Sequence, residues 1–280
     1  MNNKQKFLIV CDLDGTLLDD KKNIREKTAS YLKELMRDGN VVALASGRPP
    51  RAILPYYEEL GLKGPFVSYN GACVYDPNES SFARYDEYYS KEEILSFLSN
   101  FKNGEIVRCF AESETKVYYT DHDEEFNRMF NHEGMELVYG PLEKTLDEDV
   151  YAFVFQVKEG YEDKVNHTPL SDASLFLRHW YETDKIAEFG SLKRNKASGI
   201  SKLQSYYHID RIHTIAFGDA ENDVEMLSTA GVPYAMKNAS PHLKQIVHNI
   251  TLEDNNHEGI YLTLKAFFEE KPTNGEMQCT

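Results

Sequence analysis

Aspartates recur in two short segments that lie far apart in the sequence. The first segment is Asp12-Leu13-Asp14-Gly15-Thr16, and the second is Gly218-Asp219-Ala220-Glu221-Asn222-Asp223. Clustered carboxylates supply the oxygen ligands that Mg²⁺ prefers, and a carboxylate can also act as a nucleophile or as a general acid and base. A single aspartate after a strand is usually a turn or cap residue, so the joint occurrence of the two segments is what indicates a site.

Each candidate group directly follows an apolar run that predicts a buried strand. The runs are continuous rather than alternating, as in parallel sheets that are covered on both faces. Strands are expected at residues 7–11, 41–45, 66–69 and 212–217, followed in turn by Asp12, Ser46-Gly47-Arg48, Asn70-Gly71 and Asp219. Open α/β sheets bind their ligands at the carboxyl ends of such strands. We therefore expect these groups to meet at one edge of a sheet, near Lys196, which opens a predicted helix over 197–207.

The segments between the strands predict helices that cover a sheet. One helix is expected over residues 24–38, with Asn23 and Glu26 as a capping box, and a second helix is expected to end near Gly61. A further helix is expected to begin near Glu221, after the last long strand. The alternation of strands and helices predicts a doubly wound α/β fold.

The middle of the chain differs in character from its two ends. From about residue 82 aromatic residues become frequent, and short strands alternate with amphipathic helices; after residue 189 the first pattern resumes. The prediction is a Rossmann-like parallel-sheet core formed by residues 1–81 and 190–280. An inserted α+β cap domain is expected over residues 82–189.

The ordered motifs resemble those of the haloacid dehalogenase (HAD) superfamily, and nearly the whole chain is similar to its Cof-type phosphatases with a C2B-like cap. The resemblance implies that Asp12 becomes phosphorylated and that Asp14 acts as general acid and base. It implies a catalytic set of Asp12, Asp14, Ser46 and Lys196, a substrate-binding set of Ser46, Gly47, Arg48, Asn70, Gly71 and Lys196, and a metal-binding set of Asp12, Asp14, Asp219, Asn222 and Asp223.

The formal charges of these groups call for a divalent cation. Four ionised aspartates contribute about −4, Lys196 returns about +1, and a phosphate ester adds nearly −2. A carboxylate attacks phosphorus only if this repulsion is cancelled. Mg²⁺ suits a few carboxylates and a backbone carbonyl, because it prefers oxygen ligands and keeps several waters. We therefore expect Mg²⁺ as the cofactor.

The composition excludes several kinds of partner. The 280 residues carry 46 Asp plus Glu against 31 Lys plus Arg, a formal net charge of −15, whereas nucleic acid and anionic membranes attract basic surfaces. The early apolar run at 7–11 is too short for a membrane span or a signal peptide. The four cysteines, Cys11, Cys73, Cys109 and Cys279, form no CxxC pair, which favours reduced thiols. We expect a cytoplasmic protein without nucleic-acid or membrane partners.

The sequence thus predicts a Mg²⁺-dependent phosphatase, a monomer or weak homodimer, that hydrolyses small phosphate esters through an aspartyl-phosphate. Sugar phosphates, pyridoxal phosphate, and flavin or nucleotide precursors all fit as substrates. The same chemistry could return the phosphoryl group to a second alcohol, which would make the chain a phosphomutase. A phosphate sensor without turnover is the third alternative. The products distinguish the three: free phosphate, an isomeric phosphate ester, or none.

Overall fold

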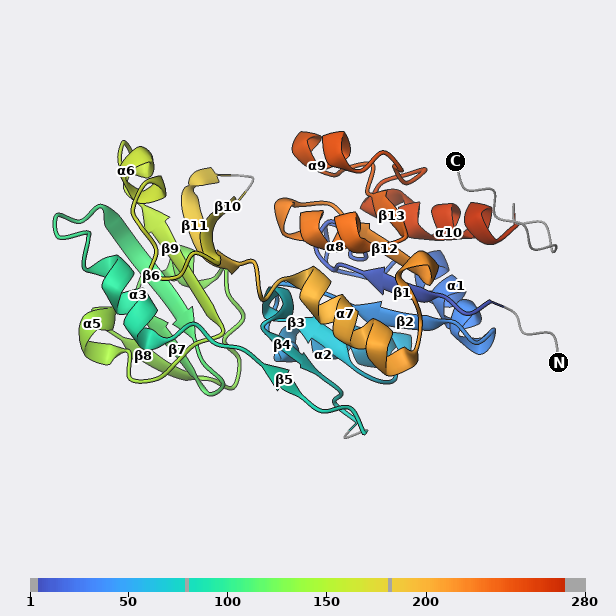
Figure 1. Cartoon of the computed structure of the whole chain (residues 1–280), viewed down its shortest axis with the longest axis horizontal. Helices are drawn as coiled ribbons and strands as arrows, with labels where there is room; N and C mark the ends of the chain where they lie inside the picture. Colours follow the sequence, from blue (N-terminus) through green and yellow to red (C-terminus); the bar gives the residue numbers. More distant parts are fainter. Residues whose placement is uncertain (1–4, 79–80, 181–182, 270–280) are drawn as a thin grey trace.

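The computed structural model describes residues 5–78, 81–180 and 183–269, and they form two lobes joined by two chain segments (Figure 1). The first and last parts of the chain build one lobe, the core. The middle part builds the other, the cap. Separate apolar clusters fill the two lobes, and the largest one lies in the core.

A parallel sheet lies at the centre of the core. Its strand order is β13-β12-β1-β2, with bounds β1 Leu8–Cys11, β2 Val41–Leu44, β12 Thr214–Gly218 and β13 Val232–Ala235. All four residues of β1 are buried, as expected for a central strand covered on both faces. The register sets Cys11 beside Leu44 on one side and Phe217 on the other, so the three strands end level with one another. The predicted doubly wound α/β core is confirmed.

A small antiparallel sheet lies beside the end of β2 in the core. It consists of β3 Phe66–Ser68, β4 Cys73–Tyr75 and β5 Tyr85–Asp86. A single parallel bridge from Ala45 to Val67 links it to the end of β2. The strand expected over 66–69 ends one residue early, because Tyr69 starts a tight turn, η1 Tyr69–Gly71, with positive φ at each residue.

Within the described residues, six α-helices belong to the core. They are α1 Glu26–Arg37, α2 Pro50–Leu60, α7 Lys196–Tyr207, α8 Val224–Thr229, α9 Pro241–Ile246 and α10 Gly259–Glu269. Helix α1 packs on α2 and α10, and α7 packs on α8. Gly61 ends α2 with a left-handed φ of 66°, in agreement with the prediction. The helix expected to begin near Glu221 starts as the short turn η3 Glu221–Asp223 and continues as α8.

The predicted capping box of α1 is wrong. Arg25 occupies the N-cap position without a side-chain cap, and the Asn23 side chain donates to the carbonyl of Lys21 instead. The carboxylate of Glu258 accepts hydrogen bonds from the backbone amides of Lys27 and Thr28 at 3.2 and 2.9 Å. A residue from the far end of the chain therefore stabilises the start of this helix.

The cap is one sheet with helices on it. The strand order is β10-β11-β9-β6-β7-β8, and every neighbouring pair is antiparallel except β7 with β8. The strands are β6 Ile106–Glu112, β7 Lys116–Tyr119, β8 Glu136–Tyr139, β9 Ala152–Val157, β10 Leu175–Trp180 and β11 Thr183–Ser191. The helices are α3 Lys91–Leu98, α4 Glu124–Asn127, α5 Leu142–Thr145 and α6 Glu162–Asn166. Ser90 and Glu93 form a capping box at the start of α3.

The chain crosses between the two lobes after β5 and again after β11 (Figure 1). Strand β5 pairs with β4 of the core, whereas β11 runs to Ser191 within the cap sheet. We infer that the chain leaves the core after Asp86 and returns after Ser191, a few residues beyond the predicted limits of 82 and 189. Within the described part of the chain, no helix has both the length and the apolar character needed to span a membrane.

Candidate active site

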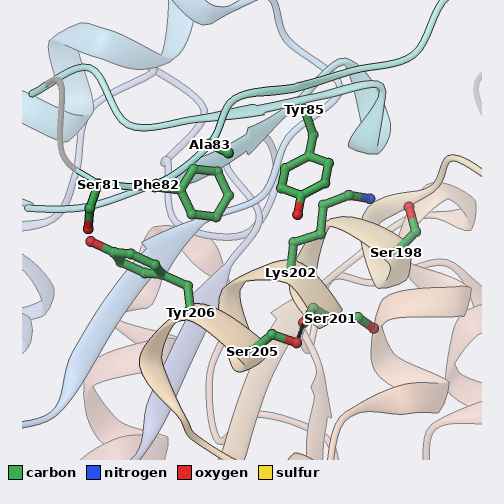
Figure 2. Close-up of a pocket in the computed structure, with 9 residues that line it drawn as sticks. All are labelled: Ser81, Phe82, Ala83, Tyr85, Ser198, Ser201, Lys202, Ser205 and Tyr206. Carbon is green, nitrogen blue, oxygen red and sulfur yellow. Dashed lines mark hydrogen bonds between the residues drawn. The ribbon is translucent and has the colours of Figure 1, made fainter.

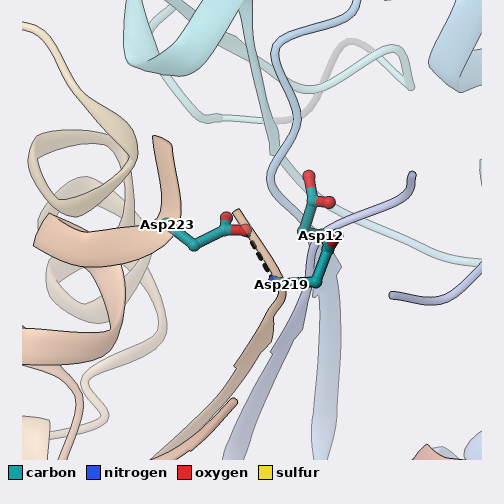
Figure 3. A group of neighbouring side chains, drawn as sticks. All are labelled: Asp12, Asp219 and Asp223. Atoms are coloured by element: carbon teal, nitrogen blue, oxygen red, sulfur yellow. Dashed lines mark hydrogen bonds between the residues drawn. The ribbon is translucent and has the colours of Figure 1, made fainter. Parts of the chain in front are cut away.

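The carboxyl ends of β1 and β12 bring the two aspartate segments together. The backbone amide of Asp12 donates to the carbonyl of Phe217 at 3.0 Å, which aligns the residue after β1 with the end of β12. Carboxylate oxygens of Asp12, Asp219 and Asp223 all lie within 4.8 Å of one another (Figure 3). Asp12 and Asp223 are buried, and Asp219 is partly buried. The expectation that distant segments meet at one edge therefore describes the fold correctly.

Lys196 supplies a cation to this cluster. Its Nζ donates to Asp12 Oδ1 at 2.6 Å and to Asp223 Oδ1 at 2.7 Å, and its side chain has no exposed surface. Burial lowers the pKa of Lys196, but the two carboxylates outweigh this effect and raise the pKa above its ordinary value. The ammonium therefore stays charged. Asn195 holds it in place by capping α7, since the Asn195 side chain accepts from the backbone amide of Ser198 at 2.9 Å.

Asp223 holds the loop after β12. Its Oδ2 accepts from the backbone amides of Asp219 at 2.9 Å and Ala220 at 3.1 Å, while its Oδ1 accepts from Lys196. A Cβ atom on Gly218 would come within 2.5 Å of the Asp223 side chain, so only glycine fits there. Asp223 therefore orders the loop that carries Asp219.

The crowding of acids changes their proton affinity. Burial, followed by repulsion from Asp223 and Asp219, raises the pKa of Asp12 well above its ordinary value against the pull of Lys196. Burial and the Asp223 charge raise the pKa of Asp219 to about 7. Among the described residues, hydrogen bonds reach one oxygen each of Asp12 and Asp219, from Lys196 and Thr16. The second oxygen of each carboxylate is thus available, and these donors fit a hard cation such as Mg²⁺.

Asp14 has different partners from Asp12. The guanidinium of Arg48 donates to both of its oxygens, at 2.6 and 2.7 Å, and Lys22 Nζ donates to Asp14 Oδ1 at 2.7 Å. Burial raises the pKa of Asp14, but the hydrogen bonds and charges of Arg48 and Lys22 outweigh it and lower the pKa below its ordinary value. Gly15 has a φ of 69° and lies close to Asp219. A Cβ atom at this position would come within 2.3 Å of Asp219 Oδ2, so the contact requires glycine.

The predicted phosphate-binding residues line the neighbouring loops. Ser46 is buried, and its Oγ accepts from the backbone amide of Arg48 at 3.2 Å. Asn70 lies between two loops, since its backbone amide donates to the Ser46 carbonyl at 3.0 Å and its Oδ1 accepts from Asn222 Nδ2 at 3.0 Å. A Cβ on Gly47 would lie 3.1 Å from the Asn70 side chain, so these loops are in close contact.

Sequence reasoning missed several contacts of this site. Lys22 pairs with Asp14, Thr16 donates to Asp219 Oδ1 at 2.8 Å, and Glu188 of the cap accepts from Asn70 Nδ2 at 3.3 Å. Thr16 lies inside the first aspartate segment, so its position offered a signal. Lys22 and Glu188 belong to no motif, and only the folded chain brings them to the site.

The carboxylate cluster is distinct from a hollow of about 620 Å³ between α7 and the segment over residues 81–85 (Figure 2). Phe82, Tyr85, Lys202 and Tyr206 are among the residues that line this hollow, and the predicted site residues are absent from its described walls. The hydroxyl of Ser205, which also faces it, donates to the carbonyl of Ser201 in its own helix. We assign no chemistry to this hollow.

Comparison with known proteins identifies the family. The profile of the haloacid dehalogenase-like hydrolases matches residues 9–264. The chain is a member of this family. The HAD-like chain is 34% identical to the 5-amino-6-(5-phospho-D-ribitylamino)uracil phosphatase YitU of Bacillus subtilis, with 94% of this chain and 97% of YitU covered. It is 33% identical to the putative phosphatase YkrA of Bacillus subtilis, covering 87% and 91% of the two chains.

Solved structures agree with this assignment. The HAD subclass IIB sugar phosphatase BT4131 superposes with a TM-score of 0.77 at 22% identity, covering 94% of this chain and 99% of that one, which shows the fold alone. A protein from Geobacillus kaustophilus HTA426 superposes with a TM-score of 0.74 at 25% identity over 94% of this chain and 99% of that one. Together the family profile and the named relatives show that the chain is a HAD-like phosphatase.

Proposed function

We propose that the chain is a Mg²⁺-dependent phosphomonoesterase in which Asp12 is the nucleophile. One observation carries the proposal. The Asp12 carboxylate lies 2.6 Å from the fully buried Lys196 ammonium, and one of its oxygens lies within 4.8 Å of oxygens of Asp219 and Asp223. A nucleophilic carboxylate must keep one oxygen free while neighbouring cations offset its repulsion from phosphate. Lys196 on Oδ1 supports this role, because one oxygen of Asp12 could attack phosphorus beside that ammonium while the other is left for the metal.

Magnesium would be held by Asp12 and Asp219 together with the backbone carbonyl of Asp14, and Asp223 would support the loop behind them. When bound, Mg²⁺ supplies positive charge that offsets the repulsion between the carboxylates and the phosphate. The raised pKa values of Asp12 and Asp219 fit this assignment, because burial and the neighbouring carboxylates disfavour the ionised forms, and a bound cation would offset both effects. Asn222, which donates to Asn70, would act on the substrate side of the loop rather than as a ligand.

The phosphoryl group would be received by the loops that follow β2 and β3. The Ser46 hydroxyl, the backbone amide of Gly47 and the side-chain amide of Asn70 would donate to its oxygens, and Lys196 would offset the charge that develops on them. The guanidinium of Arg48 would also contact the phosphate, because its two donors to Asp14 have the spacing that a phosphate accepts. Gly71 lets the loop approach the start of α7 closely.

Asp14 would then act as general acid toward the leaving-group oxygen and as general base toward the attacking water. In the first step the bond between Asp12 and phosphorus forms, the ester bond breaks, and the leaving oxygen takes a proton from Asp14. Asp14 would carry that proton only after Arg48 has moved from it to the phosphate, because Arg48 lowers the pKa of Asp14 while the two are paired. In the second step Asp14 takes a proton from the water that attacks the aspartyl-phosphate, which releases inorganic phosphate and restores Asp12. The cap would exclude bulk water and select the leaving group.

For the substrate, we propose a phosphorylated flavin precursor of the ribitylaminouracil type. The support is the relative YitU, which is named for 5-amino-6-(5-phospho-D-ribitylamino)uracil and matches 94% of this chain, including the cap. Sugar phosphates and pyridoxal phosphate fit the same core chemistry, and they form the comparison arms of the test.

The test is turnover of these substrates with Mg²⁺, followed by phosphate release and by analysis of the organic product. We expect free phosphate in all productive cases and the highest kcat/KM with the flavin precursor. Asp12→Asn should lose at least about 10³-fold in kcat, because the nucleophile is gone. Asp19→Asn is the matched control, since Asp19 is also a buried aspartate, but its carboxylate accepts from backbone amides of its own turn and pairs with Arg25 at 3.8 Å, outside the aspartate cluster.

Three outcomes would overturn the proposal. Full turnover by Asp12→Asn would show that Asp12 is not the nucleophile. An isomeric phosphate ester in place of free phosphate would identify a phosphomutase. Binding of phosphate esters without turnover of any of them would identify a sensor.

A further inference from the structure

The turn between β3 and β4 holds a large residue in an unfavourable backbone conformation. Tyr69 has a φ of 47°, Asn70 has 52° and Gly71 has 100°. Positive φ suits glycine and is tolerated by asparagine, but it is uncommon for a bulky aromatic residue. Such a conformation persists only where the surroundings fix it, and it is concentrated at functional sites. The question is therefore which contacts hold Tyr69.

The cap provides those contacts. The Tyr69 hydroxyl donates a hydrogen bond to Glu112 Oε1, at the end of β6. The Tyr69 ring stacks on the ring of Tyr151, with the centroids 4.7 Å apart and the planes 4° from parallel. The backbone amide of Tyr151 donates to the carbonyl of Glu112 at 2.7 Å, so the two cap residues form one unit. Tyr69 is thus a core residue whose side chain is seated in the cap.

Glu112 is itself firmly fixed. Only 2% of its side chain is exposed, and Arg51 of helix α2 donates to it at 2.5 Å from the core side. The same guanidinium also donates to the carbonyl of Asn131 in the cap. A carboxylate this deeply buried is stabilised by a charge partner and by hydrogen bonds, and here both come from the core. Glu112 therefore contacts Tyr69 only while the cap is docked.

The residue after Tyr69 reaches into the active site. The backbone amide of Asn70 donates to the carbonyl of Ser46, and its side chain lies between Asn222 of the core and Glu188 of the cap. The donor Asn222 stands next to Asp223, which binds Lys196. A rotation of the Tyr69 backbone toward ordinary φ would carry Asn70 away from Ser46 and Asn222.

We propose that Tyr69 is a positioning residue: the cap, through Glu112 and Tyr151, holds Tyr69 so that Asn70 bridges the Ser46 loop and Asn222 only when the cap is docked. The inference rests on the proposed function, since Asn70 is one of the groups assigned there to the phosphoryl oxygens. Docking of the cap over a substrate would then complete the phosphate-binding loops. With the cap undocked, the bridge would be lost and hydrolysis would be slow.

The test compares variants that remove this link from its two ends. Tyr69→Phe keeps the stacked ring but loses the hydroxyl that donates to Glu112. Glu112→Gln removes the negative charge of the acceptor in the cap. We expect each to lower kcat for the best substrate by at least about tenfold, because small displacements of a positioning group have large effects on rate. Tyr57→Phe is the matched control, since the buried Tyr57 donates to the carbonyl of Gly64 at 2.9 Å within the core. Its kcat should stay within about twofold of the wild type.

A double variant separates positioning from a general structural role. If Tyr69 acts through Asn70, then Tyr69→Phe should lower kcat little further in an Asn70→Ala background, whereas independent effects would multiply. A full additional tenfold loss in that background, or an unchanged kcat in both Tyr69→Phe and Glu112→Gln, would overturn the inference.

Hydrogen exchange gives a readout that does not need turnover. The backbone amide of Asn70 is bonded to Ser46, so peptides that cover residues 66–75 should exchange faster in Glu112→Gln than in wild type or Tyr57→Phe. If the wild type hydrolyses no phosphate ester, the proposed function fails. The comparison of exchange rates would still show whether Glu112 of the cap holds the turn that carries Asn70. Equal exchange in Glu112→Gln and wild type would contradict the coupling even in an active enzyme.

Discussion

The Lys196 ammonium lies 2.6 Å from the Asp12 carboxylate, although none of the Lys196 side chain is exposed. A buried lysine is retained only if its charge is compensated, and Asp12 and Asp223 provide this compensation. The same ammonium offsets part of the repulsion among three clustered aspartates. Fold stability and proposed catalysis thus depend on one contact.

Lys196→Met should therefore be strongly destabilising. The substitution keeps the volume but leaves the buried Asp12 and Asp223 carboxylates without their cation, a change of about 3–5 kcal/mol. The measurement is urea denaturation in the absence of divalent ions. Lys202→Met, on the same helix, is the control and should cost no more than about 1 kcal/mol, because Lys202 is partly exposed. Equal midpoints for the two variants would contradict this account of the cluster.

Magnesium should stabilise the folded chain. Burial and the neighbouring carboxylates raise the pKa values of Asp12 and Asp219, and a bound cation would offset both effects. Binding to the folded state alone adds about 2.7 kcal/mol at a hundred times Kd. The measurement is the melting temperature with Mg²⁺ and with a chelator. In Asp219→Asn the Mg²⁺-dependent increase should be much smaller, while the Asp19→Asn control should keep it. An increase of the same size in Asp219→Asn would exclude Asp219 as a ligand.

The buried cysteines should be unreactive in the folded protein. Cys11, Cys73 and Cys109 are free and buried, and Cys279 lies outside the described residues. Burial raises the pKa of the Cys11 and Cys109 thiols far above the ordinary value, and it raises that of Cys73 to about 12. Because the thiolate is the reactive form, a rise of pH to 9 should not activate them. With Cys279→Ser, a thiol reagent should modify none of the three rapidly at pH 9, and all three after denaturation.

The sequence predicts the centre of the site because short local patterns determine where its residues lie. Asp12 and Asp219 follow apolar runs, and parallel strands end at a common edge, so the two could be placed together without coordinates, with Lys196 at the start of a predicted helix nearby. The predicted Asn23 and Glu26 capping box fails for the opposite reason. The residue that replaces it, Glu258, is more than two hundred positions away, and no local pattern marks it.

The contacts between cap and core also escape sequence reasoning. Tyr69 and Glu112 are 43 positions apart, and neither residue belongs to a recognised motif. Their pairing depends on how the cap sheet sits on the core, which is set by the packing of both lobes. The positive φ of Tyr69 is likewise invisible, because tyrosine carries no preference for it.

Gly71 connects the turn after β3 to the start of α7. Its φ is 100°, and a Cβ atom there would come within 2.1 Å of the Asn195 carbonyl oxygen. Asn195 caps the helix that begins with Lys196. Gly39 has nearly the same φ, 96°, but among the described residues no atom would lie within 4 Å of its added Cβ. The two glycines therefore separate the effect of backbone conformation from that of steric contact.

We expect Gly39→Ala to cost about 1–2 kcal/mol in stability, from the unfavourable φ alone, and to leave kcat unchanged. Gly71→Ala should cost more, because the Asn195 backbone has to move as well, and it should lower kcat, because Lys196 moves with Asn195. The measurements are urea denaturation and steady-state kinetics on both variants under one set of conditions. If Gly71→Ala matched Gly39→Ala in both stability and kcat, then close packing of this turn against α7 would not be what positions Lys196 beside Asp12.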